Sequence, residues 1–181
     1  MIEAVLESNT SCLLGCSEVV TDFYGEWTDN GASLVRESHP AVEASVPRTR
    51  ALVAGYTVRA GASSEQLDAV RLAVSEAVTN VVQHAYRGQS GPIRLSVAVV
   101  PGELWVLVAD EGCGRHVPSA HPGLGWGLRL IASSCRELVL AAPADHGTEV
   151  RMRFCVGAGA LCEDAVPVQE SRRNPPGPIQ S

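Results

Sequence analysis

The sequence of 181 residues contains no apolar run close to the roughly 20 residues that a membrane-spanning helix needs. Its N-terminal segment also lacks the basic region of a secretory signal peptide and carries acidic residues instead. Neither a membrane anchor nor an export signal is indicated. We therefore expect a cytoplasmic protein that does not act at a membrane.

An excess of basic charge is lacking as well. Lys and Arg number 14 against 20 Asp and Glu, the formal net charge is −6, and the basic residues form no cluster. Proteins that bind nucleic acid through its phosphates present basic patches, so we expect no direct binding to nucleic acid. The same charge balance argues against attraction to anionic lipid.

Cysteine pairs with metal-binding spacing are missing. The six cysteines form no C-x-x-C pair, and the two nearest the N-terminus have no histidine close by. They are Cys12, Cys16, Cys113, Cys135, Cys155 and Cys162. We predict reduced, mostly buried thiols and no cysteine metal site.

The length predicts one domain, because domains average about 150 residues. Residues 1–30 carry few periodic signals and are interpreted as an N-terminal extension. Residues 31–154 form the predicted domain, and residues 155–181 form a flexible, proline-rich tail.

Hydrophobic spacing within 31–154 predicts three helices and five strands, with no βαβ alternation. The strongest helix begins at a capping Ser64 and ends at Gly88, with apolar residues every three or four positions from Leu67 to Ala85. Before it come a short edge strand at 33–36 and a helical pattern from Val42 to Ala60, in which Pro47 suggests that the helix itself begins near that residue. After it come strands at 93–100 and 104–109, a helix at 125–134, and strands at 137–141 and 148–154. This order predicts an α+β fold, a two-layer α/β sandwich with helices on one face of a mixed, mainly antiparallel sheet.

Polar residues recur every four positions on the strongest helix. Glu76, Asn80 and His84 would share one helical face, distinct from the apolar stripe. The alternative is that they are simply the solvated side of the helix.

Glycine is concentrated in one stretch, where five of the 17 glycines lie between Gly112 and Gly127. The first cluster, DEGCG, follows an apolar strand and places Asp110 at the strand end. The second, GLGWG, opens a helix, where free N–H groups and the helix dipole suit phosphate. Neither cluster is a Walker loop or a Rossmann fingerprint, and a turn or hinge is the alternative role.

Taken together, four segments resemble the motifs of the histidine-kinase-type ATPase superfamily. EAVTNVVQHAY (76–86) resembles its N box, DEGCG (110–114) and GLGWGL (123–128) its two glycine motifs, and GTEV (147–150) its closing G-T motif. Within the superfamily, the N box ending in H-A-Y resembles that of the bacterial anti-sigma factor serine/threonine kinases. The resemblance covers about residues 34–154 and implies the same fold.

The resemblance also implies a role for each matching residue. Asn80 would bind Mg²⁺, and Glu76 would act as the catalytic base toward a Ser or Thr hydroxyl. Asp110 would accept a hydrogen bond from the adenine amino group of ATP, and Thr148 would help to hold the base. The remaining cofactor-binding residues would be His84, Gly112, Gly114, Gly123, Leu124, Gly125, Gly127 and Leu128. For His84, an ordinary helix-surface histidine is the alternative.

The implied function is that of an ATP- and Mg²⁺-dependent kinase that phosphorylates an anti-sigma factor antagonist and binds an RNA polymerase sigma factor by partner switching. Homodimers are common in the family. Two departures keep alternatives open: the segment between the glycine motifs, 115–122, is short, and His121-Pro122 stands where some of these kinases have Arg. The alternatives are an ATP-binding regulatory module without phosphotransfer and a detached sensor histidine kinase catalytic domain.

Overall fold

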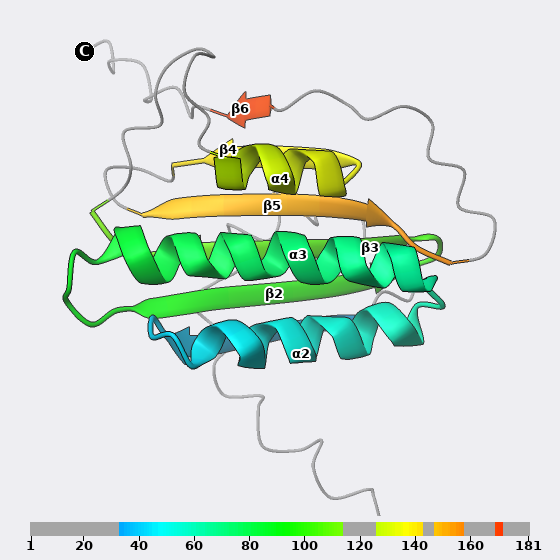
Figure 1. Cartoon of the computed structure of the whole chain (residues 1–181), viewed down its shortest axis with the longest axis horizontal. Helices are drawn as coiled ribbons and strands as arrows, with labels where there is room; N and C mark the ends of the chain where they lie inside the picture. Colours follow the sequence, from blue (N-terminus) through cyan, green and yellow to red (C-terminus); the bar gives the residue numbers. More distant parts are fainter. Residues whose placement is uncertain (1–32, 114–125, 143–146, 158–168, 172–181) are drawn as a thin grey trace, which may run out of the picture. The chain divides into compact units, whose positions relative to one another are not determined.

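The computed structural model describes residues 33–113, 126–142, 147–157 and 169–171. The described strands form one six-stranded sheet in the order β1-β2-β3-β5-β4-β6, antiparallel throughout except for the parallel pair β4·β6. In chain order the elements are β1 (Ser33–Pro40), α2 (Ser45–Arg59), α3 (Ser64–Asn80), the π-helical turn η2 (Val81–Ala85), β2 (Pro92–Val100), β3 (Glu103–Asp110), α4 (Trp126–Ser134), β4 (Glu137–Ala141), β5 (Thr148–Cys155) and β6 (Gln169–Ser171) (Figure 1).

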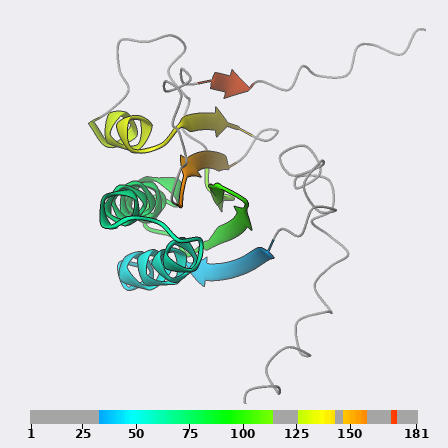
Figure 2. The same ribbon diagram turned by 90° about the vertical axis from the view of Figure 1, so that its right-hand side faces the viewer.

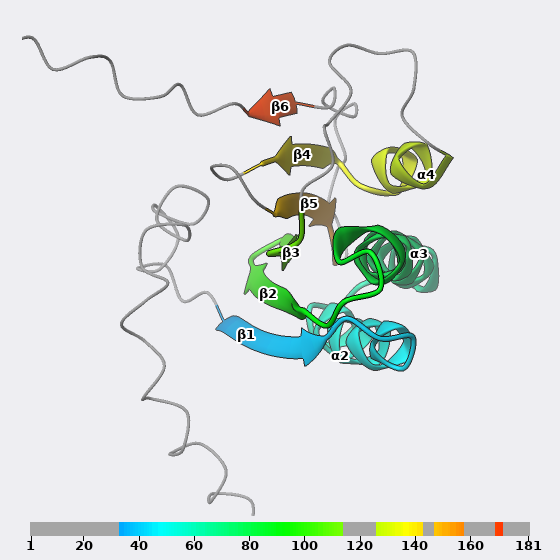
Figure 3. The ribbon, with the colours of Figure 1, turned by 90° about the vertical axis from the view of Figure 1, so that its left-hand side faces the viewer.

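The three α-helices lie on one face of this sheet. Figures 2 and 3 view the domain from opposite sides, and in both the helices α2, α3 and α4 form one layer beside the strands. The predicted two-layer α+β architecture is therefore confirmed, with a mixed and mainly antiparallel sheet.

The core lies between α3 and the central strands. Alternate residues of β2, β3 and β5 point toward the helices, because successive side chains of a strand face opposite sides. Fully buried examples are Ile93, Leu95, Leu104, Val106 and Met152. They pack in one cluster with the α3 stripe Val70, Ala73, Val74, Ala77 and Val78. Burying one such side chain contributes about 1.5–3 kcal/mol, so this contact fixes α3 on the sheet.

The start of α3 differs by one residue from the prediction. Ser63, not Ser64, is the N-cap, with extended backbone angles of φ −67° and ψ 166°. Its hydroxyl accepts the N–H of Gln66 at 3.2 Å, and the Gln66 Oε1 accepts the N–H of Ser63 at 2.9 Å. Two neighbouring serines made the position ambiguous, and the reciprocal bond with Gln66 selects the first.

The end of the same helix also differs. The predicted helix continues regularly to Ala85, whereas the structure changes to a π turn at Val81. The chain then reverses through two residues with positive φ, Arg87 at 49° and Gly88 at 84°. Gly88 therefore marks the end of the helical segment, as predicted.

Part of the predicted tail belongs to the sheet. Residues Gln169–Ser171 form β6 and pair with Val139–Ala141 of β4. β5 also extends one residue further than predicted, to Cys155, and Val156 beyond it is buried. The other residues of the predicted tail after Gly157, and the predicted extension 1–30, lie outside the described residues.

Candidate functional site

Two of the predicted motifs meet at one end of the sheet. Asp110 ends β3 and Thr148 begins β5, and the two are register partners because the strands are antiparallel. The backbone continues this contact beyond the strands, where the Gly147 N–H donates to the Gly112 carbonyl at 2.8 Å. The first glycine motif and the closing G-T motif, which are far apart in the sequence, are therefore adjacent in the fold.

Asp110 is a buried carboxyl group, with 4% of its surface exposed. Its Oδ1 accepts the N–H of Gly112 at 2.9 Å. Burial raises the pKa of the Asp110 carboxyl above its ordinary value of 3.8, while the N–H groups of Gly112 and Thr148 and the charge of Arg94 lower it in part. A buried acceptor at a strand end can recognise a hydrogen-bond donor such as an amino group.

Two positions near Asp110, Gly112 and Gly147, need glycine because another stretch of backbone passes very close to each. A Cβ atom at Gly112 would overlap the carbonyl group of Ala85, the last residue of η2. Gly147 has φ +86°, and a Cβ there would overlap the carbonyl oxygen of Asp110. The packing of Gly112 against Ala85 is therefore enough to explain the glycine at this position. The resemblance implies a second reason, which is that Gly112 leaves room for the adenine base.

Glu76 and Asn80 lie one α-helical turn apart on α3, and both are partly buried. Glu76 reaches the start of α4, since a Cβ atom at Gly127 would overlap its carboxylate. The N–H groups in the first turn of a helix have no intrahelical acceptor. The predicted base and the predicted phosphate-binding helix end are therefore in contact.

His84 lies in a π turn, where the prediction had a regular α-helix. Residues Val81–Ala85 form this turn, whose hydrogen bonds run from i to i+5 instead of from i to i+4. The His84 side chain is exposed. The regular α-helix predicted from Val81 onward was therefore wrong, and the role of His84 at the site stays a prediction.

Leu128 packs partly buried against the core, which gives its side chain a structural contact. Gly114, Gly123, Leu124 and Gly125 lie outside the described residues.

Within the described ranges, no group of three or more His, Cys, Asp or Glu side chains is placed to hold a metal ion. Two of the described cysteines, Cys135 and Cys155, are buried as predicted, whereas Cys113 is exposed. Burial raises the pKa of Cys135 to about 12.

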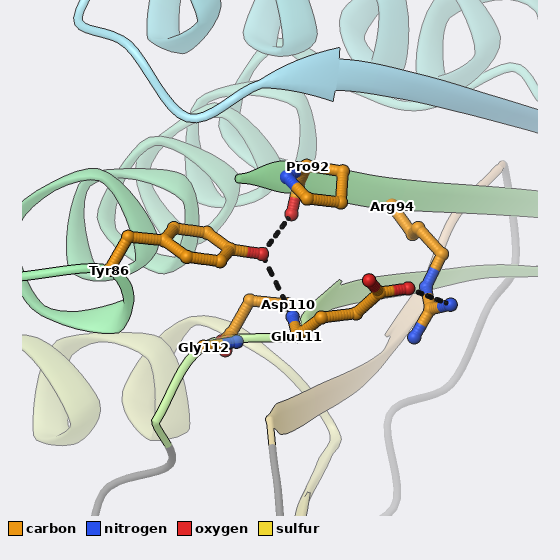
Figure 4. A network of polar contacts seen from close by, with 6 residues as sticks. All are labelled: Tyr86, Pro92, Arg94, Asp110, Glu111 and Gly112. Carbon is orange, nitrogen blue, oxygen red and sulfur yellow. Dashed lines mark hydrogen bonds and ion pairs between the residues drawn. The ribbon is translucent and has the colours of Figure 1, made fainter. Parts of the chain in front are cut away.

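A polar network that the sequence reasoning missed braces the Asp110 segment (Figure 4). The Tyr86 hydroxyl donates to the Pro92 carbonyl at 2.6 Å and accepts the N–H of Glu111 at 2.9 Å. The Arg94 Nη1 lies 2.7 Å from the Glu111 carboxylate. Tyr86 is the last residue of the N-box segment, but its place in the motif does not indicate which groups its hydroxyl contacts.

Comparison with known proteins agrees with this arrangement. Residues 39–154 match the family described as "Histidine kinase-like ATPase domain". That range covers more than half of the sequence and contains the described site residues. The chain belongs to this family of nucleotide-using ATPase domains.

Curated relatives fall among the anti-sigma factor kinases that the motifs resemble. The serine-protein kinase RsbW of Bacillus subtilis is 36% identical over 84 residues, which are 46% of this chain and 52% of that protein. The anti-sigma F factor of Clostridium acetobutylicum is 28% identical over 115 residues, 58% of this chain and 80% of that protein. The chain thus spans about half the length of the kinase relative.

A solved structure supports the fold. The crystal structure of the RsbU and RsbW domains of a Mycobacterium tuberculosis protein matches with a TM-score of 0.56 at 22% identity, covering 71% of this chain and 34% of that chain. No helix in the described part of the chain is long and apolar enough to cross a membrane.

Proposed function

We propose that the chain is an ATP-dependent serine/threonine protein kinase that also acts as an anti-sigma factor. The proposal is supported by contacts between motifs of a nucleotide-using family: the N box contacts the first glycine motif at Gly112, and Gly112 contacts the closing G-T motif at Gly147. The first glycine motif carries a buried carboxyl group, Asp110, and the N box carries Glu76, whose carboxylate meets the start of α4.

Recognition of adenine is assigned to Asp110. Adenine presents an amino group where guanine presents a carbonyl oxygen. An ionised carboxylate accepts hydrogen bonds but cannot donate them, so Asp110 favours adenine over guanine. Its partner across the strands, Thr148, borders the same position and is proposed to hold the base beside it.

Phosphoryl transfer is assigned to Glu76 as the proton acceptor from a Ser or Thr hydroxyl. Asn80, one turn further on, supplies an amide oxygen of the kind that Mg²⁺ accepts as a ligand. When bound, the metal would neutralise phosphate charge. Gly127 and the glycines before it are proposed to direct backbone N–H groups toward the phosphates.

Besides the metal, the cationic side chains that this sequence can offer to the transferred phosphate are arginine and histidine, because it contains no lysine. Arg129 is exposed on α4, two residues after Gly127, and Arg115 is the other arginine close in sequence. These two are the proposed replacements for the arginine that some of these kinases place before the second glycine motif.

The partners proposed from the relatives are an anti-sigma factor antagonist, as the phosphate acceptor, and an RNA polymerase sigma factor. Serine-protein kinase and anti-sigma F factor are the names of the curated proteins that the chain is similar to. A cytoplasmic site of action and a homodimeric assembly are proposed as well. A regulatory module that binds ATP without transferring phosphate is the second candidate, because 115–122 is short.

Calorimetry with ATP tests the nucleotide and metal assignments together. The full chain should bind ATP more tightly with Mg²⁺ than without it, and Asn80→Ala should remove most of that difference. The matched control is Thr79→Ala, which removes a polar side chain from the neighbouring position of α3 and should keep the Mg²⁺ dependence. An Mg²⁺ effect that survives in Asn80→Ala would remove Asn80 as the ligand.

A further inference from the structure

We propose that Tyr86 is a positioning residue that sets the preference of the site for adenine by fixing the peptide segment that carries Asp110. This inference rests on the proposed function, because it assumes that Asp110 binds the base. It assigns to Tyr86 a specificity role that neither the family match nor the motif resemblance provides.

The Tyr86 hydroxyl links the two chain segments just beyond the last paired residues of β2 and β3, Ile93 and Asp110. It donates to the Pro92 carbonyl at the start of β2 and accepts the N–H of Glu111 just after β3 (Figure 4). Burial raises the pKa of this phenol above its ordinary 10.0, so it keeps the proton that the bond to Pro92 needs at neutral pH.

The bonded N–H belongs to the peptide unit directly after Asp110. Gly112, one residue further, donates its N–H to the Asp110 Oδ1 at 2.9 Å. The backbone that starts at Asp110 is thus held at Glu111 by Tyr86, and it returns at Gly112 to hold the Asp110 carboxylate. A shift of the Glu111 amide would move Gly112 and with it the carboxylate oxygen.

The neighbouring residue holds the other side of the same segment. The Ala85 carbonyl accepts the N–H of Cys113 at 3.0 Å. Two consecutive residues, Ala85 and Tyr86, therefore bind residues 113 and 111 on either side of Gly112. These two residues stand at the end of the π turn, so the irregular end of α3 is the part of the helix that hydrogen-bonds residues 111 and 113. Such turns are frequent at functional sites.

The tyrosine ring packs directly against Gly91, where there is no room for a side chain. A Cβ atom at Gly91 would overlap the ring carbons of Tyr86. The contact with the Asp110 segment can therefore be disturbed in two independent ways: by removing the hydroxyl, or by adding a methyl group at Gly91. A role for the hydroxyl in positioning predicts that both changes act on the Asp110 segment.

A merely structural role would give a different result. If Tyr86 only stabilised the fold, its loss would reduce the folded fraction, and the apparent affinities for ATP and GTP would fall by the same factor. The ratio of the two affinities depends on the geometry of Asp110 and not on the folded fraction. That ratio is the measurement that separates positioning from stability.

The test is calorimetric titration of the full chain with ATP and with GTP for wild type, Tyr86→Phe and Gly91→Ala. The matched control is Tyr56→Phe, whose ring lies on α2 beside Arg59, away from the Asp110 segment. We expect Tyr86→Phe to lose roughly 2- to 10-fold in ATP affinity, the value of one hydrogen bond. GTP affinity should change by less than about twofold, and Gly91→Ala should lower the ratio in the same direction.

Hydrogen exchange gives a second readout that needs no nucleotide. In Tyr86→Phe the Glu111 amide should exchange faster than in wild type and in Tyr56→Phe. An unchanged ATP-to-GTP ratio in both Tyr86→Phe and Gly91→Ala would overturn the inference, as would an unchanged Glu111 exchange rate.

Asp110→Ala distinguishes this failure from failure of the proposed function. If wild type prefers ATP and Asp110→Ala loses the preference, the adenine assignment stands, and an unaltered Tyr86→Phe removes Tyr86 alone. If wild type shows no preference for ATP, the assignment of Asp110 fails and the inference about Tyr86 fails with it.

Discussion

Burial and hydrogen bonding have opposite effects on the carboxyl group of Asp110. Burial favours its neutral form, whereas the N–H groups of Gly112 and Thr148 favour the ionised one. The strongest influence is burial, so the pKa lies above its ordinary value. A carboxyl group kept at a strand end against this penalty is typical of a binding residue rather than of a fold-stabilising one.

Asp110→Ala should weaken ATP binding by about 1–3 kcal/mol, or roughly 5- to 150-fold, because the adenine amino group would lose its acceptor. Calorimetry of a variant that is shown to be folded measures this directly. Asp68→Ala, at an exposed position on α3, is the matched loss of a carboxylate and should leave the affinity unchanged. ATP affinity that stays at the wild-type value in Asp110→Ala would remove the adenine assignment.

The raised pKa of Asp110 also predicts a pH dependence of stability. The folded chain holds the Asp110 proton more tightly than the unfolded chain, for which 3.8 is the ordinary value. As pH rises from 3.8 to the raised pKa, the unfolded chain loses this proton first, and the contribution of Asp110 to the free energy of unfolding falls. Above the raised pKa it stays constant.

Denaturant unfolding of wild type and Asp110→Ala across this pH range measures the effect. The free energy of unfolding of wild type, relative to the variant, should decrease with rising pH and then level off. A relative stability that increases with pH would mean that the hydrogen bonds from Gly112 and Thr148 outweigh burial.

Single residues could be predicted from the sequence where their chemistry follows from a motif position. Asp110, Gly112 and Thr148 were named and do come together. The partners of Tyr86 could not be predicted, because Pro92 and Glu111 lie on two other segments and bind through backbone atoms that any residue carries. The π turn that contains His84 could not be predicted, because no side-chain pattern indicates such a turn.

At the scale of elements, α3 depends on the cap at its first turn. Ser63→Ala removes an oxygen that accepts the Gln66 N–H and should cost about 0.5–2 kcal/mol of unfolding free energy. Ser64→Ala is the matched control, because Ser64 is the first helical residue and the cap is Ser63. The two variants are compared by denaturant unfolding. A larger loss for Ser64→Ala than for Ser63→Ala would contradict the observed cap.

Element types and most of their bounds followed from hydrophobic period and turn residues. The strand β4 (Glu137–Ala141) was predicted with its observed bounds, and α4 begins one residue from its predicted start. The strand β6 escaped prediction, because three residues, Gln169–Ser171, carry no readable alternation. Its pairing with β4 is a tertiary contact that sequence spacing does not encode.

For the molecule as a whole, the division into a domain and a C-terminal tail makes a testable claim. A chain that ends at Val156 should melt within about 4 °C of the full chain, because it keeps the buried core and loses three paired residues at the sheet edge. A chain that ends at Ser171 retains β6 and is the matched control. A fall of about 10 °C or more only in the shorter chain would show that β6 is an essential part of the fold.

The central claim for the whole molecule is that it transfers phosphate from ATP to a protein hydroxyl with Glu76 as the base. Transfer of radiolabelled phosphate from ATP to a purified anti-sigma factor antagonist tests it most directly, with wild type and Glu76→Gln compared at equal ATP occupancy. Glu76→Gln keeps the shape of the side chain beside Gly127 but removes the proton acceptor. Wild type should label a Ser or Thr of the antagonist, and Glu76→Gln should bind ATP yet transfer about 10²- to 10⁴-fold more slowly. Equal rates in the two proteins would contradict the role of Glu76, and ATP binding by wild type without any transfer would establish the regulatory module instead of the kinase.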